Sequence, residues 1–333
     1  MLGEYFDKIA RVKAETKKKA VLMVGNTAKP FAGSFYTTPI RVARDHVVGG
    51  VICNDYEFLR DWTDRIGSEF AALFVDVEVK HCEPGVAHPW QRLADMFPDV
   101  WRLPYKSNDL TGQAFQDYFN HLFFDSRRAL VIGAGNIGSK VAQFLVESGV
   151  DTAVFRRDSA KCRQIAEGIN AGLPAGVTAR AHWLADLDLA EGAYDLIVLA
   201  TPGNPVFGDA LYERLGHPRY ILDIGKGCLE AAFVERRDRP PLFRLDVSLQ
   251  LSKIVNAMDD NLAYFGRRWS AVESAGLTLV PAGLAARAGE VIVDQVDHTG
   301  MVFGVANGKG ELIRDPGPEM AVRLKALLHG ERD

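Results

Sequence analysis

The order of apolar and polar residues predicts an alternation of helices and strands in the first third of the chain. Four segments space their apolar side chains as one face of a helix does, and the second begins at Asn54, a residue type that caps helices. Two apolar segments are short enough to be strands, and the first ends in glycine. The predicted helices are 3–18, 54–67, 88–98 and 112–124, and the predicted strands are 20–25 and 71–80.

From residue 128 onward the pattern changes to apolar runs that each end near a glycine. Such runs, alternating with helical segments, are typical of a parallel sheet in an α/β protein. We therefore predict a Rossmann domain, in which helices cover a doubly wound parallel sheet. Its strands are expected within 128–135, 150–155, 194–205, 219–227 and 276–283.

The chain has 333 residues, more than one hydrophobic core usually holds, so we expect two α/β domains. An N-terminal substrate domain should span 1–110, and the Rossmann domain 111–285. The remaining segment, 286–333, should pack back towards the N-terminal domain and hold a β-hairpin and a helix. The hairpin is expected at Asn307-Gly308, because this dipeptide is a strong turn signal.

A glycine-rich turn follows the strand at 128–135 and precedes a helical segment, with Gly133, Gly135 and Gly138 in the spacing G-x-G-x-x-G. In a dinucleotide-binding turn the first glycine permits the tight bend and the second lets the backbone approach the pyrophosphate. The third allows the helix to pack closely on the strand. The N–H groups at the helix N-terminus then face the phosphates, so we predict a dinucleotide site here.

Two arginines, Arg156 and Arg157, stand where NAD-binding proteins carry an acidic residue for the ribose. A guanidinium can instead clamp the 2′-phosphate of NADP, so we expect NADP rather than NAD. In the alternative reading both arginines are solvated loop charges and Asp158 serves the ribose. The expected cofactor contacts are Gly133, Gly135, Asn136, Ile137, Gly138, Arg156, Arg157, Ser159, Thr201 and Pro202.

The formal net charge of −4 argues against a nucleic-acid partner or an anionic membrane surface. Four cysteines have no paired spacing, no signal peptide is recognisable, and no apolar run reaches membrane-spanning length, so we expect a cytoplasmic protein. The expected partner is a small-molecule substrate, and a homodimer stays open. We expect no metal site, because His81, Cys82 and His88 lack further ligands at the usual spacing.

Three stretches resemble motifs of the shikimate/quinate dehydrogenase family. They are "NDLTG" at 108–112, the basic stretch "FRRDSAKCRQIAEGIN" at 155–170, in which Arg157 matches the family's arginine, and "LIVLATPGNP" at 196–205. The resemblance implies an NADP-dependent dehydrogenase with an N-terminal domain of the amino-acid dehydrogenase type. It also makes Asp109 catalytic and places Gln295, as a substrate contact, in a segment similar to the family's C-terminal helix.

Two family segments are missing. The Ser-x-Ser-Pro stretch that holds the substrate carboxylate is replaced by 25–39, which offers Asn26, Ser34, Thr37 and Thr38 as substrate contacts. A strand comparable to the family's lysine-bearing strand ends with Lys80. We expect Lys80 and Asp109 to form the catalytic pair, within hydrogen-bond reach of each other or of one shared water. Lys106 is the rival base, which would replace Lys80 if that distance fails.

Hydride transfer between NADP(H) and a small hydroxy or keto compound is the activity that these residues favour. An amine/imine dehydrogenase and a non-catalytic NADP-binding protein remain as alternatives. Lys226 lies just past a predicted strand. It is either a solvated turn residue or a ligand for a phosphate or a substrate carboxylate.

Overall fold

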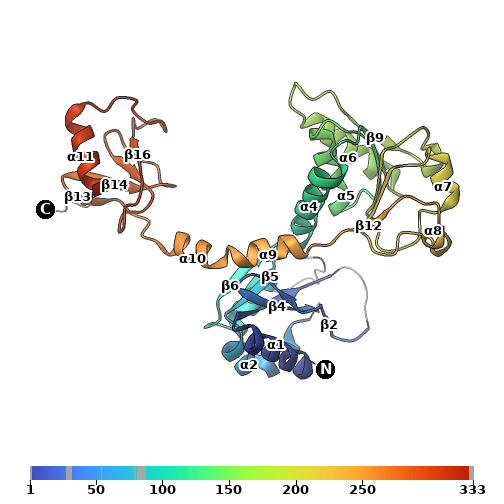
Figure 1. Ribbon diagram of the computed structural model, residues 1–333, viewed down its shortest axis with the longest axis horizontal. Coiled ribbons are helices and arrows are strands. Elements are labelled where there is room, and N and C mark those ends of the chain that lie inside the picture. Colours follow the sequence, from blue (N-terminus) through green and yellow to red (C-terminus); the bar gives the residue numbers. More distant parts are fainter. Residues whose placement is uncertain (1, 28–31, 54, 79, 81–87, 330–333) are drawn as a thin grey trace. The chain divides into compact units, whose positions relative to one another are not determined.

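The computed structural model describes residues 2–27, 32–53, 55–78, 80 and 88–329. It is an α/β structure whose internal contacts divide the chain into a first unit, residues 1–256, and a second unit, residues 257–333 (Figure 1). Among the described residues, the first unit contains two sheets and the second unit a third one. Across the described residues, the helices are too short or too polar to cross a membrane.

The first sheet forms the N-terminal lobe and has the order β2-β4-β1-β5-β6, with β3 also paired to β4. Strands β4, β1, β5 and β6 run parallel, and β2 and β3 are antiparallel to β4. The strands are β1 (Lys19–Gly25), β2 (Phe35–Thr37), β3 (Arg41–Val42), β4 (His46–Cys53), β5 (Ala72–Asp76) and β6 (Arg102–Tyr105).

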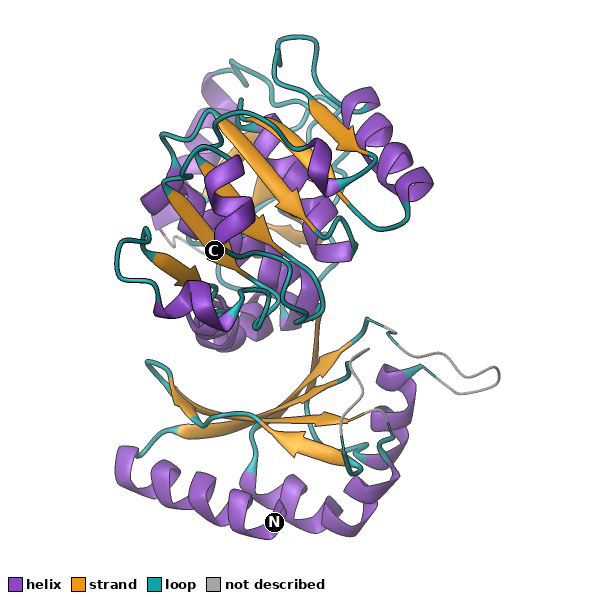
Figure 2. Cartoon of the chain, turned by 90° about the vertical axis from the view of Figure 1, so that its right-hand side faces the viewer, coloured by secondary structure: helices purple, strands orange, loops and turns teal. Residues whose placement is uncertain are grey.

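Helices cover one face of this sheet, as Figure 2 shows. They are α1 (Leu2–Thr16), the 3₁₀-helix η1 (Glu57–Trp62), α2 (Thr63–Glu69) and α3 (Pro89–Met96). Helix α1 lies close to β4 because the strand has glycine where a side chain would collide. A Cβ at Gly49 would lie 2.3 Å from Ile9 Cδ1. Tyr5 joins the two layers, since its hydroxyl donates to Thr38 O and accepts from Gly50 N.

The second sheet has the Rossmann order β12-β11-β10-β7-β8-β9, with all neighbours parallel. Its strands are β7 (Arg128–Ile132), β8 (Asp151–Phe155), β9 (Ala181–Leu184), β10 (Leu196–Leu199), β11 (Tyr220–Asp223) and β12 (Leu242–Arg244). The helices are α4 (Ser107–Tyr118), the π-helix η2 (Phe119–Phe123), α5 (Asn136–Glu147), α6 (Ser159–Ala171), the 3₁₀-helix η3 (Leu187–Leu189), α7 (Asp209–Arg214), α8 (Ala231–Glu235) and α9 (Ser248–Asn256).

Strand order reverses between β7 and β10, the first strands of the two halves of the sheet. Both faces of these strands are buried. One set of side chains packs under α5 and α6, and the alternate set packs under α7 and α8. A sheet buried on both faces needs apolar residues throughout, which is why the sequence shows continuous apolar runs here. The carboxyl ends of β7, β8 and β10 therefore meet at one edge, next to the point of reversal.

The second unit contains α10 (Met258–Gly266), β13 (Val272–Ser274), β14 (Leu277–Pro281), β15 (Val291–Val293), β16 (Val302–Val305) and α11 (Pro318–His329). Strand β14 pairs with β13 and β15, so the expectation that 276–283 forms a Rossmann strand is wrong. The apolar run alone did not reveal its partners. The contact boundary falls after residue 256, whereas the sequence suggested one after 285.

The chain turns at Asn307-Gly308, and Ala306 bridges Leu312 in antiparallel fashion, as the turn signal predicted. Gln295 lies in a loop after β15 rather than in the helix that the family resemblance implied. The predicted helix at 112–124 begins earlier, at Ser107, so residues 108–112 form its first turns. The proposed helix cap Asn54 lies outside the described residues.

Candidate functional site

A cavity of about 520 Å³ opens at the carboxyl edge of the Rossmann sheet. Its walls come from the turn between β7 and α5, the end of β8 and the turn after β10. Six of the ten predicted cofactor contacts line it, namely Gly133, Gly135, Arg156, Arg157, Thr201 and Pro202, together with Ile132, Phe155, Asp158, Leu187, Ala200, Asn204 and Val206. Asn136, Ile137 and Gly138 form the first turn of α5 beside it, and Ser159 begins α6.

The three glycines of the turn have different surroundings. Gly133 has φ +106°, and a Cβ there would lie 2.7 Å from the backbone of Ala200 and Thr201. A Cβ at Gly138 would lie 2.2 Å from Gly133 O, so this glycine lets α5 approach the turn. At Gly135 a Cβ would meet no described atom within 4 Å. Two of the glycines therefore serve the fold, and Gly135 leaves space that faces the cavity.

Arg156 and Arg157 follow β8, and both residues line the cavity. Arg156 is half-buried, and its Nη1 donates to Ala134 O in the glycine turn at 3.1 Å. Arg157 is exposed.

Asp158 caps helix α6, because its Oδ1 accepts from Lys161 N at 3.0 Å. That backbone hydrogen bond lowers the pKa of the Asp158 carboxyl. The carboxylate nearest the end of β8 in sequence is thus already engaged by the protein.

A second turn, residues 224–228 after β11, supports the turn 201–203. A Cβ at Gly225 would lie 1.9 Å from Thr201 O, so the two backbones touch. Cys228 Sγ lies 3.0 Å from Thr201 Oγ1. Asp223, which is 3% exposed, accepts backbone hydrogen bonds from Lys226 and Gly227, each at 2.8 Å. This packing holds the cavity wall at Thr201 in place.

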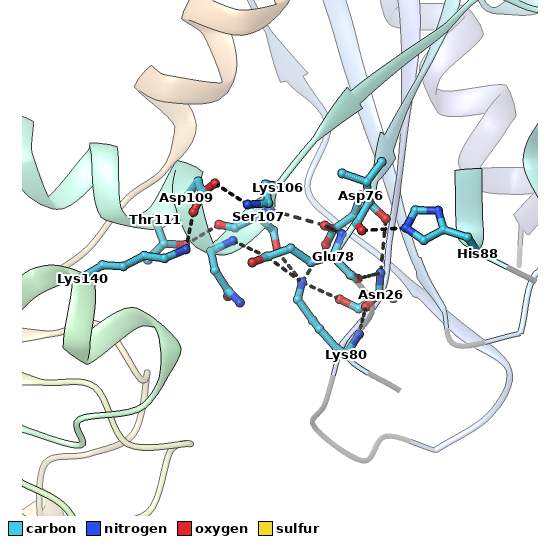
Figure 3. Close-up of polar contacts among 12 residues, drawn as sticks. Asn26, Asp76, Glu78, Lys80, His88, Lys106, Ser107, Asp109, Thr111 and Lys140 are labelled. Atoms are coloured by element: carbon cyan, nitrogen blue, oxygen red, sulfur yellow. Dashed lines mark hydrogen bonds and ion pairs between the residues drawn. The ribbon is translucent and has the colours of Figure 1, made fainter. Parts of the chain in front are cut away.

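Lys80 lies in the N-terminal lobe, in a cluster at the ends of β1 and β5 (Figure 3). Its ammonium donates to Asp76 Oδ2 at 2.6 Å, to Asn26 O at 3.1 Å and to Ser107 Oγ. Asp76 is 1% exposed, and Glu78 Oε2 lies 3.8 Å from the ammonium. The lysine therefore has a carboxylate partner, but it is not the predicted one.

Asp109 points toward Lys140 and Lys106 instead of Lys80 (Figure 3). The hydrogen bond from Lys140 lowers the pKa of the Asp109 carboxyl below its usual value. The expected contact between Lys80 and Asp109 is thus corrected to a Lys80–Asp76 pair. The reason is local. Asp109 is the third residue of α4 and lies on the side of that helix that faces α5, and Lys140 belongs to α5.

The end of β5 also caps α4. Glu78 Oε2 accepts from Asn108 N at 2.8 Å, and Asp76 Oδ1 lies 3.4 Å from Ser107 N. Carboxylates at a helix N-terminus complement its dipole. Sequence reasoning missed Asp76, Glu78, Ser107 and Lys140. A usable signal existed for Asp76 alone, an acidic residue that ends a buried strand at the carboxyl edge of a parallel sheet.

Buried hydroxyl and thiol groups surround the Asp76 end of this cluster. Burial raises the pKa of the Cys53 thiol to about 12. It also raises the pKa values of Tyr56 and Tyr105, and the negative charge of Asp76 raises them further. These groups are neutral at ordinary pH. Asp76 and Lys80 thus form an ion pair that has Glu78 on one side and uncharged hydroxyl and thiol groups on the other.

The other predicted substrate contacts separate in the structure. Asn26 joins the Lys80 cluster, where its Nδ2 donates to Glu78 O at 2.7 Å. Thr37 lies on β2, Ser34 precedes that strand, and Thr38 packs over Gly50 of β4. Strand β4 separates β2 from β1, so these three residues lie away from the cluster. Gln295 belongs to the second unit.

His88 caps α3 by accepting from Trp90 N, whereas His81 and Cys82 lie outside the described residues. Within the described ranges, no group of three or more His, Cys, Asp or Glu side chains is arranged to hold a metal ion.

Residues 116–226, which include the glycine turn and the cavity walls, match the family model for shikimate / quinate 5-dehydrogenase. This segment is a divergent relative of that family. The curated relatives include glutamyl-tRNA reductases. That of Kineococcus radiotolerans is 32% identical over 123 residues, which are 37% of this chain and 22% of that protein. That of Campylobacter jejuni is 30% identical over 99 residues, which are 29% of this chain and 22% of that protein. The chain thus spans about a fifth of the length of these relatives.

Solved structures are similar at low identity. A shikimate dehydrogenase in complex with NADP⁺ is 14% identical and covers 73% of this chain and 90% of its own, with a TM-score of 0.40. The L-tryptophan dehydrogenase from Nostoc punctiforme is 12% identical and covers 74% of this chain and 75% of its own, with a TM-score of 0.41.

Proposed function

We propose that the cavity at the Rossmann edge binds NADP(H) and that the protein is an NADP-dependent oxidoreductase. The observation that carries this proposal is the charge at the end of β8. Arg156 and Arg157 line the cavity, while Asp158 is engaged as the cap of α6. Two guanidinium groups favour the dianionic 2′-phosphate of NADP, and a ribose that carried only hydroxyls would leave them unpaired.

The first turn of α5 supplies the pyrophosphate site in this proposal. The N–H groups at the start of a helix have no intrahelical partners, and the dipole favours an anion there. Gly135 leaves room for the backbone to approach the phosphates, because a Cβ at this position would face open space.

Bound NADPH would supply a hydride to a carbonyl carbon of a small hydroxy/keto substrate. The carbonyl oxygen then needs a proton, and we assign its donation to Lys80, because the ammonium is held beside Asp76 and the side chain is still 15% exposed. Asp76 keeps the ammonium oriented and compensates its charge. Asn26 O and Ser107 Oγ complete its coordination, and a substrate oxygen would replace one of them.

A second candidate is a protein that binds NADP without turnover. The observation in its favour is that all three ammonium protons of Lys80 have acceptors inside the protein. A lysine that only joins β1, β5 and α4 would have the same contacts.

The cofactor is tested by titrating the wild type with NADPH and with NADH at one moderate salt concentration. We expect at least about tenfold tighter binding of NADPH, because a charge-assisted contact contributes at least about 1.5 kcal/mol. The variant R156Q/R157Q should remove the preference. Arg163, an exposed arginine of α6 paired with Glu167, provides the control variant R163Q, which should keep it. Equal affinities in the wild type would exclude the assignment of NADP.

Turnover is tested by NADPH oxidation with a panel of keto and imino compounds. For an enzyme, Lys80→Met should lower kcat at least about a hundredfold, the usual contribution of a positioned acid or base, while the Kd of NADPH stays the same. Lys80→Arg keeps the ion pair with Asp76 and serves as the matched fold control. If the wild type binds NADPH tightly and turns over none of the panel, the non-catalytic candidate is favoured.

A further inference from the structure

Lys226 has a backbone conformation that lysine rarely adopts. Its φ is +58°, in the left-handed region that favours glycine. Among the residues that the structure describes, three other non-glycine residues share this feature, but Lys17 and His217 follow helices and Ala275 occupies a hairpin turn. Lys226 instead lies at the carboxyl edge of the Rossmann sheet, after β11. A strained residue at such an edge points to a role for its side chain.

The strained turn is held by a buried carboxylate. Asp223 accepts from the backbone N–H groups of Lys226 and Gly227, each at 2.8 Å, and from Cys228 N at 3.4 Å. These three N–H groups compensate the charge of Asp223. The carboxylate therefore fixes the backbone of Lys226 without needing its ammonium.

The same turn is packed against the cavity wall. Ile224 N and Gly225 N both donate to Leu199 O at the end of β10. A Cβ at Gly227 would lie 3.3 Å from Gly203 O, which belongs to the turn 201–203. The position of Lys226 relative to this wall is thus set by backbone contacts on both sides.

The side chain of Lys226 is exposed, and no ion pair joins its ammonium to a carboxylate of the described residues. Its charge nevertheless reaches the neighbouring loop. The pKa of Asp246 is lowered by its hydrogen bonds to Ser248 and, to a smaller extent, by the charges of Arg41 and Lys226. The ammonium is thus available to an anion that enters from solvent.

We propose that Lys226 binds the anionic group of the substrate at the nicotinamide half of the site, an inference that rests on the proposed binding of NADP(H). In a doubly wound sheet the dinucleotide lies across the switch point, with one nucleotide over each half of the sheet. Arg156 and Arg157 place the adenosine half beyond β7 and β8. The nicotinamide half then lies over the ends of β10 and β11, where Lys226 is located.

The shared chemistry of the ligand is a carboxylate or a phosphate monoester on a small hydroxy or keto compound. A lysine ammonium binds either group as a point charge, and this contact favours the anion over its neutral analogue. The residue would thus determine specificity without taking part in hydride transfer.

The test compares matched anionic and neutral compounds with the NADPH-loaded protein. The pairs are pyruvate and methyl pyruvate, 3-dehydroshikimate and its methyl ester, and dihydroxyacetone phosphate and dihydroxyacetone. The wild type should turn over the anionic member of at least one pair at a kcat/KM at least about tenfold higher. The pair that shows this difference in kcat/KM indicates whether the bound group is a carboxylate or a phosphate.

Lys226→Gln should then raise KM for that anion at least about tenfold while kcat and the Kd of NADPH stay within about twofold, and Lys226→Arg should restore KM. Lys17 provides the matched control, since it is also an exposed lysine with a positive φ, of 55°. Lys17→Gly and Lys226→Gly should raise Tm alike, because glycine removes the same strain. Only Lys226→Gly should weaken binding of the anionic substrate.

Three outcomes would overturn the proposal. The wild type could turn over the neutral and anionic members of each pair equally well, or Lys226→Gln could leave KM for the anion unchanged. The third outcome is a wild type that binds NADPH but turns over no anion of the panel. A wild type that binds no NADPH would instead refute the proposed function, and this inference with it.

Discussion

The sharpest prediction concerns the two glycines that border the first turn of α5. At Gly135 a Cβ would meet no described atom within 4 Å, whereas at Gly138 it would lie 2.2 Å from Gly133 O. Valine at position 135 should therefore leave the fold intact and fill the space proposed for the pyrophosphate. Alanine at position 138 should instead force α5 away from the glycine turn.

The magnitudes follow from these surroundings. Gly135 has φ −91°, which any residue adopts, so Gly135→Val should cost at most about 1 kcal/mol of unfolding free energy. If the valine displaces two charge-assisted contacts from the phosphates, it loses about 3–6 kcal/mol of binding, or about a hundredfold to ten-thousandfold in Kd. Gly138→Ala should cost about 1–3 kcal/mol of stability through overpacking.

Denaturant unfolding and NADPH titration of both variants separate the two effects. Gly135→Val should unfold near the wild-type midpoint and bind NADPH at least about a hundredfold more weakly. Gly138→Ala should unfold at lower denaturant. A folded Gly135→Val protein that binds NADPH as tightly as the wild type would refute the reasoning, because the turn would then be structural alone.

Three further outcomes are expected. Lys140→Gln should raise the pKa of Asp109, which carboxyl NMR measures. The folded-state pKa of Asp109 in the wild type is lowered, so the stabilisation from this ion pair is fully present above the unfolded-state pKa. It is lost as the pH falls through the folded-state pKa. Asp158→Ala should cost about 0.5–2 kcal/mol in urea unfolding, the value of a helix cap, with no loss of NADPH affinity, and a large loss would assign Asp158 to the ribose. Cys53 should resist iodoacetamide at pH 8 until the chain unfolds, because burial raises its thiol pKa to about 12; rapid labelling of the native protein would contradict that environment.

Part of the fold follows from residues that are close together in the sequence. The strand at 128–132, the glycine turn and helix α5 form one continuous segment, and its G-x-G-x-x-G spacing specified both the bend and the close packing of the helix. Such features can be predicted where a glycine acts on backbone within a few residues of it, as Gly138 does on Gly133. Arg156 and Arg157 could be placed at the cavity for the same reason, since they directly follow the next strand. The approach of Gly133 to Ala200 and Thr201 is not local and became visible only in the structure.

Other strands could not be assigned from their own residues. The run at 277–281 has the apolar character of a Rossmann strand, yet it pairs with β13 and β15. Strand β4 escaped sequence analysis, although it pairs with β1 along its length. Its two glycines weaken the apolar signal, and their purpose becomes evident only once Ile9 and Thr38 are seen packed against them.

The partners of charged side chains depended on the tertiary structure most of all. The sequence by itself identified Lys80 and Asp109 as charged residues near strand and helix ends. It could not tell that β5 ends with Asp76 beside Lys80, or that Asp109 faces Lys140 across two packed helices. A glycine turn encodes its geometry in neighbouring backbone, whereas an ion pair depends on where distant elements bring two long side chains, and only the packing of β5, α4 and α5 decides that.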